Sequence, residues 1–256
     1  RPRCVVFIAG TLGMGGAEKQ LYYILQALHT SGLEVLLLSL TNGEFWQRPI
    51  EELGVSVIWV GQNRSRAVRL WKILEIVSKF SPDLIQSQHF YVNMYAALAG
   101  VVLNIPSLGA IRSNLTAEIN SNGAHGKWCL RLPRYLVTNS GAAMEKALIL
   151  GIKPERIFYL PNVIDCDLFF PKPMRNGHPL RLLSVGTLNR EKNISLFMDV
   201  CFELRRQMDI KAFLVGDGPE RGKLEEKARL LDLSPEVFCF VGRSENVLSY
   251  YQSADV

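Results

Sequence analysis

The feature that most constrains this chain is a regular alternation of short apolar runs with longer amphipathic segments. The first run, Cys4–Ala9, is rich in β-branched residues and is typical of a buried strand. A glycine-rich loop over Gly10–Gly16 follows, and from Ala17 apolar residues recur at the spacing of a helix that closes at Gly32. Alternation of this kind predicts a mainly parallel sheet with helices on both faces.

The same pattern extends over the first 170 residues. The further strands that it predicts are Val35–Leu40, Val55–Val60, Leu84–Ile85, Ser107–Ile111 and Tyr135–Thr138. The further helices are Val68–Phe80, Tyr95–Leu103 and Ala142–Leu150. Because ligands of parallel sheets bind at the carboxyl ends of the strands, we expect functional residues in the loops that follow the strands.

A change of composition divides the chain. Phe170–Pro179, with three prolines, one glycine and two basic residues, is typical of an interdomain linker. The alternation then restarts, with strands at Leu182–Val185, Ala212–Val215 and Val237–Val241 and helices at Ser195–Met208, Arg221–Leu231 and Asn246–Ser253. We therefore predict two α/β domains with parallel sheets, at 1–170 and 180–256. Because another strand would begin near Ala254–Val256, we expect the second domain to be incomplete and the chain to be a fragment.

Composition and charge exclude several classes of protein. Hydrophobic residues make up 48% of the chain and charged residues 21%, values of a globular protein rather than a disordered one. No apolar run approaches the ~20 residues of a membrane-spanning helix. The net charge of +5 suits a phosphate-bearing ligand or an anionic membrane surface, or an ordinary solvated surface. Nucleic acid is not an expected partner, because dense Lys/Arg runs and nucleic-acid-binding motifs are absent from the sequence.

The cysteines indicate a reducing compartment. They are odd in number, scattered, and without a CxxC pair or a histidine at metal-ligand spacing: Cys4, Cys129, Cys166, Cys201 and Cys239. We therefore expect a cytoplasmic protein without a metal site. The first residue is Arg1 rather than Met, so we expect a trimmed N-terminus.

Three glycine-containing loops follow predicted strands, GMGGAE at 13–18, VGTLNREKN at 185–193 and GDGPER at 216–221. Glycine lets the backbone approach a ligand, and a helix N-terminus attracts phosphate, although each loop could also be a simple tight turn. A nicotinamide oxidoreductase is disfavoured, because G-x-G-x-x-G is absent and the second strand ends without an acid at 38–42.

In their order and spacing, these motifs resemble those of a known family. The resembling stretches are GMGGAE at 13–18, PDLIQSQ at 82–88, LVTNSGAAME at 136–145, LPNVIDCDLFFP at 160–171, LLSVGTLNREKNISLF at 182–197, LVGDGPERGKLEE at 214–226 and FVGRSENVLSYYQSADV at 240–256. Together they are similar to the retaining glycosyltransferases of family 4, which have two Rossmann-like domains (the GT-B fold). The resemblance implies transfer of a sugar, with retention, from a nucleotide-diphosphate sugar to a glycan or lipid-linked acceptor, without a cofactor or a metal. The acceptor would bind mostly to the first domain and the donor mostly to the second.

The resemblance also assigns substrate-binding residues. Gly15 and Gly16, with Glu18 of the same motif, would approach the donor phosphate or sugar, and Lys192 would bind the diphosphate. The nucleotide pocket would be lined by Gly216, Asp217 and Gly218, with Gly242 and Arg243 near the base.

Two positions depart from the family pattern. Thr187 stands where the family usually has an arginine on the diphosphate, and Arg190 is the candidate replacement, unless it is an exposed loop residue. Arg112 stands where the family often has a histidine facing the sugar, and the nearby imidazole is that of His89. Arg112 and His89 are therefore the candidate catalytic residues, although a lone histidine is more often structural.

The family's paired glutamates would lie beyond Val256, so we expect the fragment itself to be inactive. The alternatives are a non-catalytic sugar-nucleotide-binding relative, and less favoured a sugar-nucleotide epimerase or the oxidoreductase.

A basic segment near residue 70 raises the question of membrane contact. Arg64, Arg66, Arg69 and Lys72 surround Leu70 and Trp71. This pattern fits a helix attached peripherally to an anionic inner membrane surface. The favoured alternative is a solvated helix face with Trp71 in the core.

Overall fold

The structure, a computed structural model, describes residues 3–170 and 179–256. The chain divides into two compact units, Arg1–Val163 and Ile164–Val256. The linker predicted at Phe170–Pro179 lies almost wholly outside the described residues. Each unit is described below by itself.

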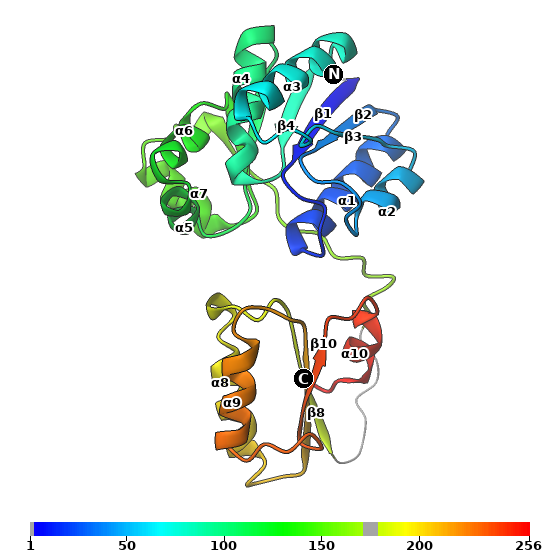
Figure 1. Ribbon diagram of the computed structural model, residues 1–256, viewed down its shortest axis with the longest axis vertical. Coiled ribbons are helices and arrows are strands. Elements are labelled where there is room, and N and C mark those ends of the chain that lie inside the picture. The colour runs from blue at the N-terminus through cyan, green and yellow to red at the C-terminus, as the bar shows by residue number, and fades with distance from the viewer. Residues whose placement is uncertain (1–2, 171–178) are drawn as a thin grey trace. The chain divides into compact units, whose positions relative to one another are not determined.

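The first unit is built on a parallel sheet of seven strands in the order β3-β2-β1-β4-β5-β6-β7 (Figure 1). The strands are β1 (Cys4–Ala9), β2 (Glu34–Ser39), β3 (Ser56–Trp59), β4 (Leu84–Ser87), β5 (Ser107–Ile111), β6 (Tyr135–Thr138) and β7 (Ile157–Tyr159). Val5 of β1 is in register with Val35 on one side and Leu84 on the other. The predicted parallel arrangement is therefore confirmed, and β7 is a strand that the sequence pattern missed.

Helices cover both faces of this sheet. They are α1 (Gly16–Thr30), α2 (Gln47–Glu52), α3 (Arg66–Phe80), α4 (Asn93–Leu103), α5 (Leu115–Ser121), α6 (Gly126–Arg131) and α7 (Gly141–Ile149), with 3-10 turns η1 (Phe90–Val92), η2 (Gly123–His125) and η3 (Pro154–Arg156). Val5 and Phe7 belong to the core beneath α1 and α2, and Val6 and Ile8 to the core beneath α3 and α4. Burial on both faces explains why β1 reads as a continuous apolar run.

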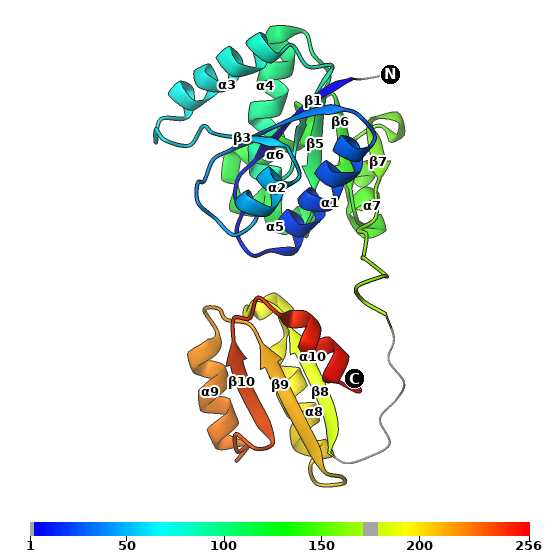
Figure 2. The same cartoon turned by 90° about the vertical axis from the view of Figure 1, so that its right-hand side faces the viewer.

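The second unit has a parallel sheet in the order β10-β9-β8, with strands β8 (Leu180–Val185), β9 (Ile210–Val215) and β10 (Phe238–Gly242). Its helices are α8 (Ile194–Leu204), α9 (Arg221–Leu230) and α10 (Val247–Ser253), with the turn η4 (Arg190–Lys192). Figure 2 shows α8 and α9 on one face of this sheet and α10 on the other. The backbones of Asp255 and Val256 pair with Arg181 and Leu183 of β8. The predicted fold class, two α/β units with parallel sheets, is confirmed.

Trp71 differs from the favoured expectation. Its side chain lies on α3 but is 65% exposed, so the prediction that it belongs to the core is wrong. Ile73 and Val77 supply the buried face of α3 instead. Within the described residues, no helix is long and apolar enough to cross a bilayer.

Candidate functional site

The glycine loop of the first unit leads from β1 directly into α1. Gly15 has an extended backbone and is the N-cap of α1, without a side-chain cap. A Cβ atom at Gly15 would lie 2.1 Å from Oε2 of Glu18, whereas one at Gly16 would meet nothing within 4 Å. Gly15 is therefore required by close packing against Glu18, while Gly16 faces open space.

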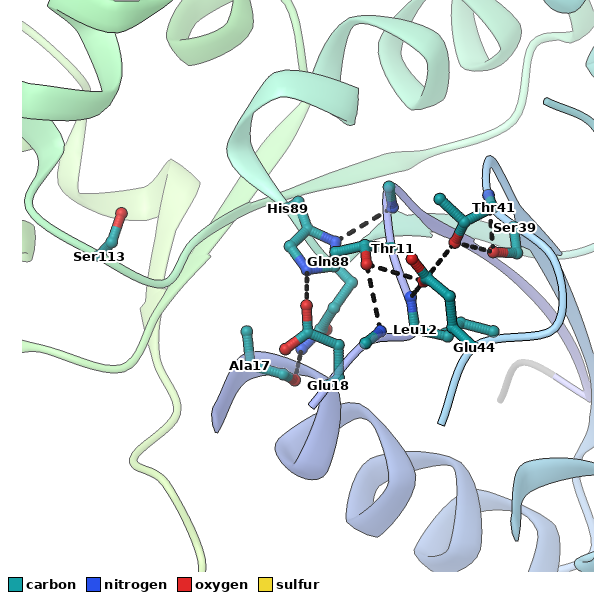
Figure 3. Close-up of polar contacts among 12 residues, drawn as sticks. Thr11, Leu12, Ala17, Glu18, Ser39, Thr41, Glu44, Gln88, His89 and Ser113 are labelled. Carbon is teal, nitrogen blue, oxygen red and sulfur yellow. Dashed lines mark hydrogen bonds and ion pairs between the residues drawn. The ribbon is translucent and has the colours of Figure 1, made fainter. Parts of the chain in front are cut away.

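Glu44, in the loop after β2, anchors this glycine loop. Its Oε2 accepts hydrogen bonds from the Thr11 hydroxyl (2.8 Å), the Leu12 amide (2.5 Å) and the Thr41 hydroxyl (2.5 Å), as Figure 3 shows. Desolvation disfavours the charged carboxylate, but the hydrogen bonds from Thr41, Leu12 and Thr11 outweigh it and lower the pKa of Glu44. An acid near the end of the strand beside β1 was the available signal, because both loops meet at one sheet edge.

His89, just after β4, is bonded at both ring nitrogens. Its Nδ1 accepts from the Gly10 amide at 3.1 Å, so Nε2 carries the hydrogen that faces Glu18 Oε1 at 3.0 Å. The two side chains are 11% and 9% exposed. The neighbouring Gln88 donates to the carbonyl of Ala17 at 2.6 Å (Figure 3). The end of β4 thus fixes the loop and the start of α1, and neither ring nitrogen of His89 is left to move a proton.

Arg112 follows β5 at the same sheet edge. Among the described residues, its Nε and Nη2 are buried without a hydrogen-bond partner. Burial also lowers the pKa of the guanidinium, which remains charged at neutral pH. The next residue, Ser113, lies apart from the His89 and Glu44 contacts in Figure 3 and donates to Glu118. Arg112 therefore offers a cation with unused donors.

Tyr91 is a further site residue that sequence reasoning missed. A Cβ atom at Gly10 would lie 2.0 Å from the Tyr91 hydroxyl, so Tyr91 packs directly on the glycine loop. Desolvation, together with the charges of Glu18, Glu44 and Glu118, raises the pKa of Tyr91 to about 12. The hydroxyl is therefore neutral at physiological pH and can donate a hydrogen bond.

In the second unit, the predicted loops after β8, β9 and β10 come together at one edge of the sheet. The Gly216 amide donates to the Gly242 carbonyl at 2.8 Å, and the Leu188 amide donates to the Asp217 carbonyl at 3.1 Å. Gly216 has a φ of 144°, and a Cβ atom there would lie 1.9 Å from the Gly186 carbonyl oxygen. A Cβ atom at Gly218 would lie 2.5 Å from the Leu188 carbonyl oxygen. Glycine is thus required for the loops to meet backbone against backbone.

The cations that the sequence singled out lie beside these loops. The stem of Lys192 passes Gly186, with its Cε 3.7 Å from the position of a Cβ at that glycine. The Lys192 side chain is exposed, and within the described part of the chain no group is bonded to its ammonium. Arg190 is 85% exposed, with its Nε 3.8 Å from Glu220 Oε1. Thr187 is exposed as well.

The remaining predicted residues lie at the same edge. Asp217 Oδ1 accepts from the Gly218 amide at 2.8 Å and lies 3.8 Å from Nη1 of Arg221. Nη1 of Arg221 is in turn 3.6 Å from the position of a Cβ at Gly242. Arg243 is exposed just beyond β10. Arg221 was not singled out from the sequence, although its place directly after the GDGPE turn puts it at this edge.

Comparison with known proteins gives matches over nearly the whole chain. The model of Glycosyltransferase Family 4 matches residues 14–168, and that of Glycosyl transferases group 1 matches residues 167–256. One relative is the human phosphatidylinositol N-acetylglucosaminyltransferase, to one subunit of which the chain is 23% identical over 231 residues. This match covers 83% of the chain and 47% of the human protein. The chain therefore spans about half the length of this relative.

Two further proteins match more of the chain. It is 24% identical over 271 residues to the GalNAc-α-(1→4)-GalNAc-α-(1→3)-diNAcBac-PP-undecaprenol α-1,4-N-acetyl-D-galactosaminyltransferase of Campylobacter jejuni, covering 98% of this chain and 71% of that protein. The crystal structure of Anabaena HepE in complex with UDP and glucose superposes with a TM-score of 0.82 at 16% identity, covering 100% of this chain and 73% of that one. At this identity, the likeness to HepE concerns the fold.

Proposed function

The chain belongs to glycosyltransferase family 4, and on this premise we propose that the protein transfers a sugar from a nucleotide-diphosphate sugar to a glycan or lipid-linked acceptor, with retention at the anomeric carbon. The observation that carries the proposal is the meeting of three glycine-containing loops at one sheet edge beside the unpaired ammonium of Lys192. Backbone amides and a cation at such an edge are what a diphosphate requires.

In this proposal the second unit binds the donor. Lys192 contacts the diphosphate, and the exposed guanidinium of Arg190 turns from Glu220 toward the same group, because Thr187 offers only a hydroxyl. Gly216 and Gly218 let the nucleotide lie close to the backbone. The HepE complex with UDP and glucose, a structure of similar fold, supports a nucleotide sugar as the ligand.

The reaction needs stabilisation of the departing diphosphate and of positive charge on the sugar. Fixed cations and amides achieve the first in a site with little water, and we propose that they do so here without a metal ion. Arg112 holds a hydroxyl or phosphate with its unused buried donors. We assign His89 to positioning, because its two nitrogens are occupied by Gly10 and Glu18.

The acceptor is proposed to be attached to a lipid. The printed names of the human and Campylobacter relatives refer to phosphatidylinositol and to a PP-undecaprenol-linked glycan. The exposed indole of Trp71 on a basic helix agrees with contact with an anionic membrane surface from the cytoplasmic side.

The test is turnover by the full-length protein. UDP-, GDP- and ADP-sugars are supplied with lipid-linked acceptors, with release of the nucleoside diphosphate and the anomeric configuration of the product followed by NMR. We expect release that depends on the acceptor, a product with the donor's configuration, and unchanged rates in EDTA. Loss of activity in EDTA, restored by a divalent cation, would contradict the metal-free proposal.

Thr187 favours one second candidate, a sugar-nucleotide-binding protein without transferase activity, because a cation is usual at that position. Binding of a nucleotide sugar without turnover of any donor would favour this candidate.

A further inference from the structure

A second concave site lies on the α3–α4 side of the first unit. It is a pocket of about 460 Å³ bounded by α3, by η1 and α4, and by the segment from the end of α5 to α6. Its lining residues are Leu40, Arg66, Ala67, Arg69, Leu70, Tyr91, Met94, Tyr95, Leu98, Ser121, Asn122, His125 and Cys129.

The charged groups of this lining have one sign. It contains two arginines and a histidine, and the described residues that line it include no aspartate or glutamate. Arg69 is fixed by hydrogen bonds from Nη1 to the Tyr95 hydroxyl and from Nη2 to the Asn63 carbonyl, both 3.1 Å, and its Nε is a buried donor without a partner among the described residues. Arg66 is exposed. An anionic group is therefore the ligand that complements this wall.

The rest of the lining is apolar, and its rim carries exposed indoles. Ala67, Leu70, Met94 and Leu98 supply alkyl surface inside the pocket. Trp71 lies one helical turn after Ala67 and is 65% exposed, and Trp128, adjacent to the lining residue Cys129, is 57% exposed. Exposed indoles beside cations are typical of protein surfaces that lie at a lipid–water interface. The ligand should therefore be anionic at one end and apolar at the other.

The pocket adjoins the glycine loop of the first unit through Tyr91. The ring of Tyr91 lines the pocket, while its hydroxyl packs on Gly10. A group held in the pocket thus lies beside the loop that leads into α1. This contiguity connects the pocket with the site at the carboxyl edge of the sheet.

We propose that this pocket binds the phosphate-bearing end of a lipid-linked acceptor, with Arg66 and Arg69 on the phosphate and the alkyl wall against the first part of the lipid. Trp71 and Trp128 then lie at the membrane surface. The inference rests on the proposed transferase function. A soluble sugar phosphate would leave both exposed indoles without a role, and general attraction to anionic lipid would need no concave site.

The test measures binding of geranylgeranyl diphosphate to the full-length protein by calorimetry, with the donor site saturated by a nucleoside diphosphate. Inorganic diphosphate and geranylgeraniol are the comparison ligands. Arg66→Ala removes a pocket cation, and Arg64→Ala removes an equal, exposed charge from a residue that does not line the pocket. Leu98→Trp fills the pocket from α4.

We expect geranylgeranyl diphosphate to bind more tightly than either comparison ligand. Arg66→Ala should weaken its binding by about tenfold, as for loss of one charge-assisted hydrogen bond, and Arg64→Ala by less than about twofold, as for a screened surface charge. Leu98→Trp should abolish its binding and leave nucleoside-diphosphate affinity unchanged.

Three results would overturn the proposal: equal losses in Arg64→Ala and Arg66→Ala, inorganic diphosphate binding as tightly as the lipid, or unchanged lipid binding in Leu98→Trp. Failure here with intact nucleotide binding and turnover would leave the proposed function standing. Binding of the lipid diphosphate without any turnover would instead count against the transferase.

Discussion

At the scale of single residues, the first site depends on a carboxylate that binds no ligand in our account. Glu44 joins the loops after β1 and β2 through its contacts with Thr11, Leu12 and Thr41. Its lowered pKa means that the charged form is favoured by folding, so its contribution to stability is present above the unfolded-state pKa of about 4.3 and is lost as the pH falls through the lower folded-state value.

We therefore predict that Glu44→Gln lowers the free energy of unfolding at pH 7 by about 1–3 kcal/mol, the range for lost hydrogen bonds to a charged group. The difference from the wild type should shrink as the pH falls below about 4, because both proteins then carry a neutral side chain there. Urea unfolding of both proteins between pH 3 and 7 measures this difference. A constant difference across that range would show that charge is not the cause.

The sequence could predict the glycine loops of this site but not the contacts that hold them. GMGGAE was identifiable because glycines between a strand and a helix have few other uses. Glu44 and Tyr91 lie on other loops, and their contacts with Leu12 and Gly10 depend on which strands neighbour β1 in the sheet. The occupied nitrogens of His89 likewise required coordinates.

At the scale of secondary-structure elements, the long elements were predictable and the short ones were not. α3 and β1 bury regular apolar patterns, so their periods indicate them. β7 has one buried residue, Ile157, followed by exposed Phe158 and Tyr159, and so it shows no period. α5 and α6 are single short segments that packing against their neighbours stabilises, for which local propensity is a weak guide.

The loops of the second unit permit a paired test with glycines. Gly216→Ala places a Cβ against the Gly186 carbonyl at a backbone conformation that favours glycine, so we predict a loss of about 2 kcal/mol or more of stability and of nucleoside-diphosphate binding. Gly222→Ala, on α9 with nothing within 4 Å, is the matched control and should be neutral or stabilising by up to about 1 kcal/mol.

Thermal unfolding and calorimetric titration of both variants provide the comparison. Equal behaviour of the two alanine variants would mean that the contact between the β8 and β9 loops does not shape the site.

At the scale of the whole molecule, the two units carry different parts of the proposed chemistry. The second unit gathers glycine loops and Lys192 at one sheet edge, and the first unit combines an anchored glycine loop, Arg112 and a cationic pocket. The class of reaction came from the order of motifs along the sequence, whereas the pocket came from residues on α3, α4 and α6 that no motif contains. Packing of distant segments is what periodicity in one sequence leaves unspecified.

The central claim, that the second unit holds the diphosphate of a sugar donor at Lys192, is tested most directly by calorimetric titration of UDP, GDP and ADP into the full-length protein and two variants. Lys192→Ala removes the cation beside Gly186, and Lys211→Ala removes an equal charge near the amino end of β9, at the opposite edge of the sheet. We predict that Lys192→Ala weakens binding of the preferred nucleotide by about tenfold or more, the loss of one charge-assisted hydrogen bond, while Lys211→Ala binds it as the wild type does. Unchanged affinity in Lys192→Ala, or the same loss in both variants, would contradict the account.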